Sequence, residues 1–265
     1  MCKGPCEDGV VTDAAASLRS LLVPGDPLLL VNAWDAASAR RFAELGARAI
    51  ATTSGGVARA LGFDDGQNTP VDEMLEAVER ITAVVDVPVT ADMEAGYDLP
   101  AGELAERLLA TGAAGLNFED SDHAHPGTLV PAEDHAERIA VLAQAGLVVN
   151  ARIDVHLNGV GAPEARLDEA LRRAALYLEA GADCVFPILL DDPVDLGAFV
   201  AAAGGPVNAL LYAGSPPLAR LRELGVARVS VGSGLASAAL DHAAGIARAL
   251  LGGDDEPLRR ADGEL

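Results

Sequence analysis

Eight short segments rich in Val, Ile, Leu and Ala recur along this chain, and each is followed by a segment with helical periodicity. Strands that alternate with helices form a parallel sheet, because each helix returns the chain to the edge where the next strand starts. Eight such units in 265 residues predict a closed (β/α)₈ TIM barrel of the α/β class. The expected strands span 28–34, 49–54, 88–94, 115–120, 147–154, 183–189, 206–211 and 228–233.

A doubly wound open sheet is the alternative fold for this alternation. Such a sheet can carry a glycine-rich dinucleotide fingerprint, and no strand here is followed by one. We expect one catalytic barrel domain over residues 25–252, preceded in residues 1–24 by a tail and a short helix at 14–22. The acidic C-terminal tail, residues 253–265, is expected to be disordered.

Composition excludes several classes of partner. The net charge of −21 argues against nucleic acid and anionic membranes, since both would repel an acidic protein. No apolar run reaches the roughly 18 residues of a membrane span, and the first residues lack the apolar core of a signal peptide. Three cysteines imply no disulfide framework, so a cytoplasmic location is expected. Cys2 and Cys6 are too few ligands to define a metal site.

The near absence of lysine limits the chemistry that this chain can perform. Lys3 is the only lysine among 19 basic residues, so a lysine Schiff base is excluded from the body of the fold. Carbanion or enolate chemistry would need stabilisation by a metal ion or by hydrogen bonds.

Two carboxylates, Asp92 and Glu94, end the third predicted strand. Side chains two residues apart leave a strand on the same face, so both acids are expected to point into one space. Like charges in a confined site repel, and a divalent cation such as Mg²⁺, which prefers oxygen ligands and water, relieves that repulsion. The alternative is an exposed pair of acids that caps the next helix.

In a TIM barrel, chemistry takes place at the carboxyl ends of the strands. Arg152 at one such end is suited to a two-point contact with a substrate carboxylate, unless it forms a salt bridge with Asp154 or Glu119. Backbone N–H groups at residues 54–56 could bind a second anionic group, or could form an ordinary turn. The candidate substrate-binding residues at the strand ends are Trp34, Ser54, Gly55, Arg152 and Asn208.

The sequence at these strand ends resembles the isocitrate lyase/phosphoenolpyruvate mutase superfamily, from about Leu28 to Ser233. The matching stretches are Asn32-Ala33-Trp34-Asp35, Thr53-Ser54-Gly55, Leu61-Gly62-Phe63-Asp64-Asp65, Asp92-Met93-Glu94-Ala95-Gly96-Tyr97, Phe118-Glu119-Asp120 and Asn150-Ala151-Arg152-Ile153-Asp154.

This resemblance implies that Asp92 binds Mg²⁺ most directly, with Mn²⁺ as the alternative ion. It also implies that Asp65, Glu94 and Glu119 hold the waters of the ion, and that Arg152 binds a substrate carboxylate. Family members act on small 2-oxo or 2-hydroxy acids through an enolate-like intermediate chelated to Mg²⁺. They typically form tetramers that exchange a C-terminal helix, so a homo-oligomer, dimer or tetramer, is expected here. The helix predicted at 234–251 is the candidate for exchange.

The chain departs from the family in the loop after Glu119. Lyases of the family carry lysine and cysteine in that loop, where the cysteine is a general acid, whereas residues 121–128 contain neither. His123 or His125 could donate a proton instead, or both could be solvated.

Three further residues bear on the expected site. Tyr97 is a candidate base or hydrogen-bond donor. Asp98 stands where the family often has a second glycine. Cys184 begins a strand at the opposite end of the barrel and is expected in the core.

Three functions are compatible with these features. The first is a Mg²⁺-dependent carbon–carbon lyase or decarboxylase acting on a small 2-oxo or 2-hydroxy (di)carboxylic acid through a metal-stabilised enolate. The second is a phosphonomutase or a phosphonopyruvate hydrolase, which the missing loop lysine disfavours because phosphoryl transfer needs positive partners. The third is a non-catalytic barrel that binds carboxylates.

Overall fold

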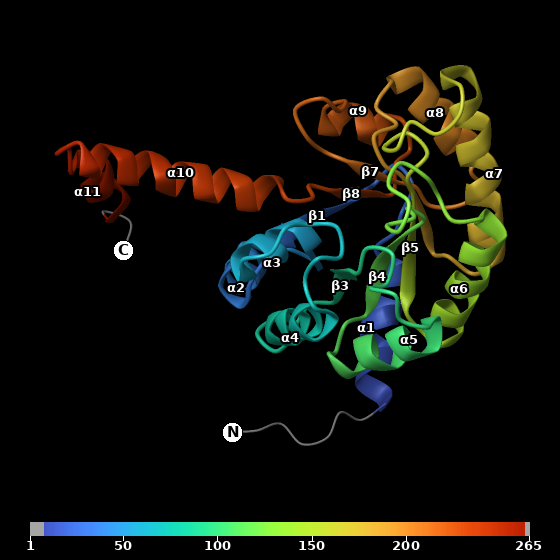
Figure 1. Cartoon of the computed structure of the whole chain (residues 1–265), viewed down its shortest axis with the longest axis horizontal. Coiled ribbons are helices and arrows are strands. Elements are labelled where there is room, and N and C mark those ends of the chain that lie inside the picture. The colour runs from blue at the N-terminus through green and yellow to red at the C-terminus, as the bar shows by residue number, and fades with distance from the viewer. Residues whose placement is uncertain (1–7, 263–265) are drawn as a thin grey trace.

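The computed structural model describes residues 8–262, and eight parallel strands form its centre (Figure 1). The strand order is β6-β5-β4-β3-β2-β1-β8-β7. A parallel bridge between Val185 and Val207 joins the two edge strands and closes the ring, which confirms the predicted TIM barrel. The strands are β1 (Leu28–Ala33), β2 (Ile50–Thr52), β3 (Val89–Asp92), β4 (Gly115–Glu119), β5 (Val148–Ile153), β6 (Cys184–Pro187), β7 (Asn208–Leu210) and β8 (Arg228–Ser230).

Helices surround the strands, and the helix predicted at 234–251 is present with those bounds. Asp35 begins α2 with a capping box, in which its carboxylate accepts from the Ser38 N–H at 2.7 Å. These helices are α2 (Ala36–Glu44), α4 (Val71–Thr82), α5 (Ala101–Ala110), α6 (Ala132–Gln144), α7 (Arg166–Glu179), α8 (Pro193–Ala202), α9 (Leu218–Glu223) and α10 (Gly234–Leu251), with a 3₁₀ turn, η1 (Pro163–Ala165), before α7.

Three predictions about helices were wrong. Helix α1 (Asp8–Ser20) starts six residues earlier than expected. Helix α3 (Ser54–Leu61) was not predicted, because its Gly55-Gly56 pair has low helix propensity. Helix α11 (Glu256–Asp262) occupies part of the tail expected to be disordered.

Helix α1 closes the amino-terminal end of the barrel. Leu18 and Leu22 pack among apolar residues from the starts of the strands, including Cys184, which is fully buried as predicted. Arg19 fixes the helix there, since its Nε donates to Asp183 at 2.7 Å and its Nη2 donates to the carbonyl of Leu147 at 3.1 Å. The carboxyl ends of the strands are thus left as the open end of the barrel.

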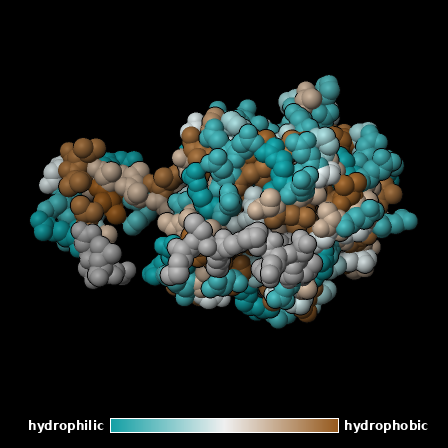
Figure 2. All heavy atoms as spheres, turned by 90° about the horizontal axis from the view of Figure 1, so that it is seen from below, coloured by the Kyte–Doolittle hydropathy of each residue, from teal (hydrophilic) through white to brown (hydrophobic). Residues whose placement is uncertain are grey.

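Helix α10 projects away from the barrel, with α11 at its outer end (Figure 1). Apolar side chains gather on this projecting segment (Figure 2), among them Leu240, Leu250 and Leu251. Across residues 8–262, no helix is both long and apolar enough to span a membrane. Lys3, Cys2 and Cys6 lie outside the described residues.

Candidate active site

Asp92 is the last residue of β3, at the open end of the barrel. Its Oδ2 accepts from the backbone N–H of Ser54 at 3.1 Å and from the Ser54 hydroxyl at 3.0 Å. Its Oδ1 is buried and has no hydrogen-bond partner among the described residues. A buried carboxylate oxygen without a partner is costly, and a bound cation would remove that cost.

The first turn of α3 consists of Ser54, Gly55 and Gly56. The alternative interpretation from sequence, that these residues form an ordinary turn, was therefore wrong. Thr53 caps this helix, and the N-terminal dipole of the helix favours a negative charge at Asp92. The Ser54 donors are therefore used by Asp92 in this structure, although Ser54 still lines the pocket described below.

Glu94 reaches the same site by a route that the sequence did not predict. Strand β3 ends at Asp92, so the argument from two residues on one strand face was wrong. The backbone instead turns through positive φ angles at Glu94 (47°), Gly96 (94°) and Tyr97 (54°). Left-handed backbone at a non-glycine residue is uncommon and is concentrated at functional sites.

Hydrogen bonds hold the Glu94 carboxylate in place. Its Oε2 accepts from the Gln67 N–H at 2.7 Å, and its Oε1 accepts from the Tyr97 hydroxyl at 2.6 Å. Burial, together with the charges of Asp92, Glu119 and Asp65, raises the pKa of Glu94 to about 7. Burial and the adjacent Glu94 raise the pKa of Tyr97 well above its usual value, and the Tyr97 hydroxyl donates to Glu94 in this structure.

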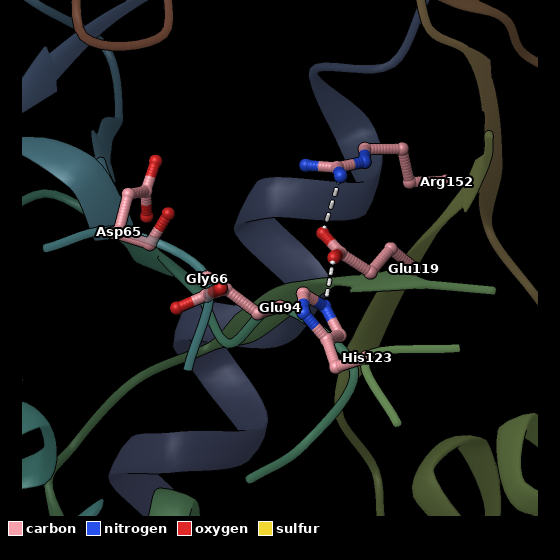
Figure 3. Close-up of a pocket in the computed structure, with 7 residues that line it drawn as sticks. Asp65, Gly66, Glu94, Glu119, His123 and Arg152 are labelled. Atoms are coloured by element: carbon pink, nitrogen blue, oxygen red, sulfur yellow. Dashed lines mark hydrogen bonds and ion pairs between the residues drawn. The ribbon is translucent and has the colours of Figure 1, made fainter. Parts of the chain in front are cut away.

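Glu119 lies between a guanidinium and an imidazole (Figure 3). Its Oε2 is 2.6 Å from Arg152 Nη2, and its Oε1 is 2.7 Å from His123 Nε2. The hydrogen bond to Glu119 raises the pKa of His123, against the opposing effect of burial. His123 lines the pocket, and its role as a proton donor stays a prediction.

Arg152 is paired on both sides, so both salt bridges considered from sequence are present. Besides Glu119, it donates from Nε and Nη2 to the two oxygens of Asp154, each at 2.7 Å. The backbone N–H of Asp154 donates to the fully buried Asp120 at 2.8 Å, and Asp120 also accepts from Tyr177 and Arg173. Arg152 is thus fixed by carboxylates, with its guanidinium at the wall of the pocket.

These side chains line one pocket of about 320 Å³, which is large enough only for a small molecule. One ligand atom from each of Glu94, Glu119 and His123 lies within 4.8 Å of the others, which is a spacing that a metal ion can bridge. Together with the unpartnered Asp92 Oδ1, this oxygen-rich set fits a hard divalent cation. The lining residues are Ser54, Asp65, Gly66, Glu94, Glu119, His123 and Arg152.

Besides Tyr97 and Asp92, described above, four predicted site residues lie outside this lining. Trp34 packs edge-to-face on Phe42, with ring centroids 6.1 Å apart. Asn208 is buried inside the barrel, where its Nδ2 donates to Ser230 at 3.3 Å. His125 is exposed and bonds to Asp122 at 2.9 Å, as expected for a solvated loop histidine.

Gly55 is the fourth of these predicted residues, and it matters because it has no side chain. A Cβ at this position would lie 2.5 Å from Asp65 Oδ2, so only glycine lets the Asp65 carboxylate approach α3 this closely. Two residues were missed: Gly66 lines the pocket, and the N–H of Gln67 bonds to Glu94. Both have positive φ, and the Gly66-Gln67-Asn68 stretch was a turn signal that could have located them.

The fold and the site define a TIM barrel with an acidic, arginine-containing pocket at the carboxyl ends of its strands. The family model for phosphoenolpyruvate phosphomutase matches residues 18–251. The chain therefore belongs to the phosphoenolpyruvate mutase/isocitrate lyase superfamily, as its sequence motifs predicted.

Several relatives illustrate the range of this superfamily. An uncharacterized protein of Mycobacterium tuberculosis is 35% identical over 91% of both chains. The 2-methylisocitrate lyase of Escherichia coli is 31% identical, over 81% of this chain and 76% of the enzyme. The structure of a phosphonopyruvate hydrolase in complex with oxalate and Mg²⁺ has a TM-score of 0.80 at 25% identity, covering 95% of this chain and 91% of that one.

Proposed function

We propose that this protein is a Mg²⁺-dependent carbon–carbon lyase that acts on a small 2-oxo or 2-hydroxy dicarboxylic acid. The observations that support it most strongly are the pocket that gathers Asp65, Glu94 and Glu119 with Arg152 and His123, and the unpartnered buried oxygen of Asp92. In this proposal Asp92 contacts the ion, and Asp65, Glu94 and Glu119 hold its waters. Mg²⁺ supplies Lewis-acid polarisation of the substrate oxygens when bound.

The side chains of the pocket have separate tasks in this proposal. Arg152 binds a substrate carboxylate through guanidinium N–H groups and keeps its orientation through Asp154. Cleavage of the C2–C3 bond of a 2-hydroxy acid removes one proton from the hydroxyl and adds one proton at C3. A pocket carboxylate accepts the first proton, and the imidazole of His123 donates the second, in place of the cysteine found in family lyases.

A phosphonomutase or a phosphonopyruvate hydrolase is the second candidate, and the match to the phosphomutase family model favours it. Phosphoryl transfer needs several positive partners around the transferred group. The lining provides one arginine and one histidine, and for this reason we rank the lyase first.

The test is a ¹H and ³¹P NMR turnover screen with and without Mg²⁺. It covers oxaloacetate, isocitrate, 2-methylisocitrate, malate-type acids and phosphonopyruvate. Mg²⁺-dependent cleavage of one carboxylic acid, abolished in Asp92→Asn and retained in the exposed control Asp168→Asn, supports the lyase. Turnover of phosphonopyruvate alone would replace it with the second candidate. Binding of oxalate without any turnover would indicate a non-catalytic carboxylate-binding barrel.

We also infer a homo-oligomer that buries the exposed leucines of α10, because such an apolar surface is unfavourable in water. The mass of the particle in solution, measured by light scattering, tests this inference. A cytoplasmic location stays a prediction from the few cysteines.

A further inference from the structure

A second cavity of about 380 Å³ adjoins the active-site pocket. His123 lines both spaces, so they meet at its imidazole. The wall of the second cavity is partly apolar. Among the described residues that line it, Arg138 from α6 is the one positively charged side chain besides the histidine. Its apolar lining consists of Ala95, Leu99, Pro100, Ala124 and Val130.

Arg138 is held rigidly but lacks an anionic partner. Its guanidinium lies over the ring of Phe118, 4.6 Å from the centroid, and its Nη2 donates to the carbonyl of Ala95 at 2.9 Å. Among residues 8–262 it forms no salt bridge, whereas the half-buried Arg107 and Arg152 each form one with a carboxylate. A half-buried, oriented guanidinium beside an apolar wall is suited to bind a carboxylate.

Two acidic residues, Asp98 and Asp122, also line the cavity, and their negative charges oppose the binding of an anion at Arg138. Asp122 is already engaged, because it accepts from the ring of His125 at 2.9 Å and from the Ala124 N–H at 3.0 Å. Asp98 is exposed and close enough to act on the charge of Arg138, but it is not ion-paired with it. Asp98 therefore lowers the affinity of the cavity for an anion, but its carboxylate does not occupy the position beside Arg138 where an anion would bind.

We propose that this second cavity is the subsite for the distal part of the substrate, a carboxylate on a short apolar chain that binds Arg138. The proposal rests on the proposed function, since the 2-oxo or 2-hydroxy acid end would occupy the first pocket. It makes the preferred substrate a dicarboxylate whose second carboxylate lies beyond His123. An acid as short as oxalate would fill only the first pocket.

The experiment measures the affinity of unreactive probes by calorimetry with Mg²⁺ present. Oxalate tests the first pocket alone. N-oxalylglycine and N-oxalyl-β-alanine add a carboxylate tail of two lengths, and N-propyloxamate adds a neutral tail of similar size. We expect at least one acid-tailed probe to bind about tenfold more tightly than the neutral one, which is a common effect of a desolvated charge-assisted contact.

Two variants assign that preference to Arg138. Arg138→Gln is expected to abolish the preference for the acid tail, while oxalate affinity changes by less than about twofold. Asp98→Asn is expected to strengthen it, and asparagine tolerates the positive φ of 58° at this position. Arg80→Gln, an exposed arginine on α4, is the control for the change in net charge.

The outcomes separate the two proposals. If oxalate binds but acid and neutral tails bind equally, the subsite is wrong and the proposed function stands. The subsite is also wrong if Arg138→Gln keeps the preference for the acid tail. If Arg138→Gln does not fold, Asp98→Asn decides, and a weaker preference for the acid tail in that variant contradicts the subsite. If neither oxalate nor any tailed probe binds with Mg²⁺, the proposed function and the subsite are both overturned.

Discussion

His135 on α6 is a buried histidine that should make the folded protein sensitive to acid. It is fully buried, stacks on Phe118 with centroids 4.6 Å apart, and meets Tyr177 edge-on at 5.0 Å. Neither ring nitrogen has a hydrogen-bond partner within the described chain. Burial and the nearby Arg138 lower the pKa of His135 to about 3. The perturbation that we consider is His135→Leu.

The expected magnitude follows from the difference in pKa between the two states. In the unfolded chain the pKa of histidine is about 6.5, so His135 takes up a proton there below that pH while the folded protein keeps it neutral. The free energy of unfolding therefore falls as the pH drops from about 6.5 towards 3, by about 1.4 kcal/mol per unit. At pH 5.0 the loss is about 2 kcal/mol, and at pH 7.5 it is close to zero.

The assay is urea unfolding of the wild type and of His135→Leu at pH 7.5 and pH 5.0, at one protein concentration. Other groups titrate in both proteins, so the quantity of interest is the difference between their losses of stability. The wild type should lose about 2 kcal/mol more than the variant over this interval. The exposed loop variant His125→Leu serves as the control and should behave like the wild type. Equal losses in the wild type and in His135→Leu would refute the reasoning.

Three further predictions concern the site and its support. Gly55→Ala should displace Asp65, because the new Cβ would lie 2.5 Å from Asp65 Oδ2, and should therefore weaken the Mg²⁺-dependent rise in melting temperature. Gly102→Ala is the matched control, because a Cβ at Gly102 meets nothing within 4 Å. Asp120→Asn should cost about 3 kcal/mol in urea unfolding, because it leaves Arg173 without the buried carboxylate 3.0 Å away; an unchanged midpoint would contradict this. Arg152→Lys should raise KM for the substrate more than it lowers kcat, because lysine keeps the charge but loses the two hydrogen bonds to Asp154 that orient the guanidinium. A kcat effect alone would argue against carboxylate binding.

The sequence by itself determined the barrel. Strand and helix periods are local properties, so the eight strands were located within a few residues and the core position of Cys184 was predicted correctly. The residue types at the strand ends likewise indicated an acidic site, and Ser54, Asp65, Glu94, Glu119, His123 and Arg152 do line one pocket. Motifs of this kind are visible in one dimension because strand ends converge in a TIM barrel.

Only the tertiary structure decided how these residues are used. Glu94 enters the site through left-handed backbone that no strand period predicts. The packing of two distant segments brings the Ser54 amide, at the start of α3, to Asp92. The choice between His123 and His125 depended on the path of one loop, which brings His123 to Glu119 and leaves His125 in solvent. Long-range distances of this kind are set by barrel closure and strand register, and a local sequence pattern contains no information about them.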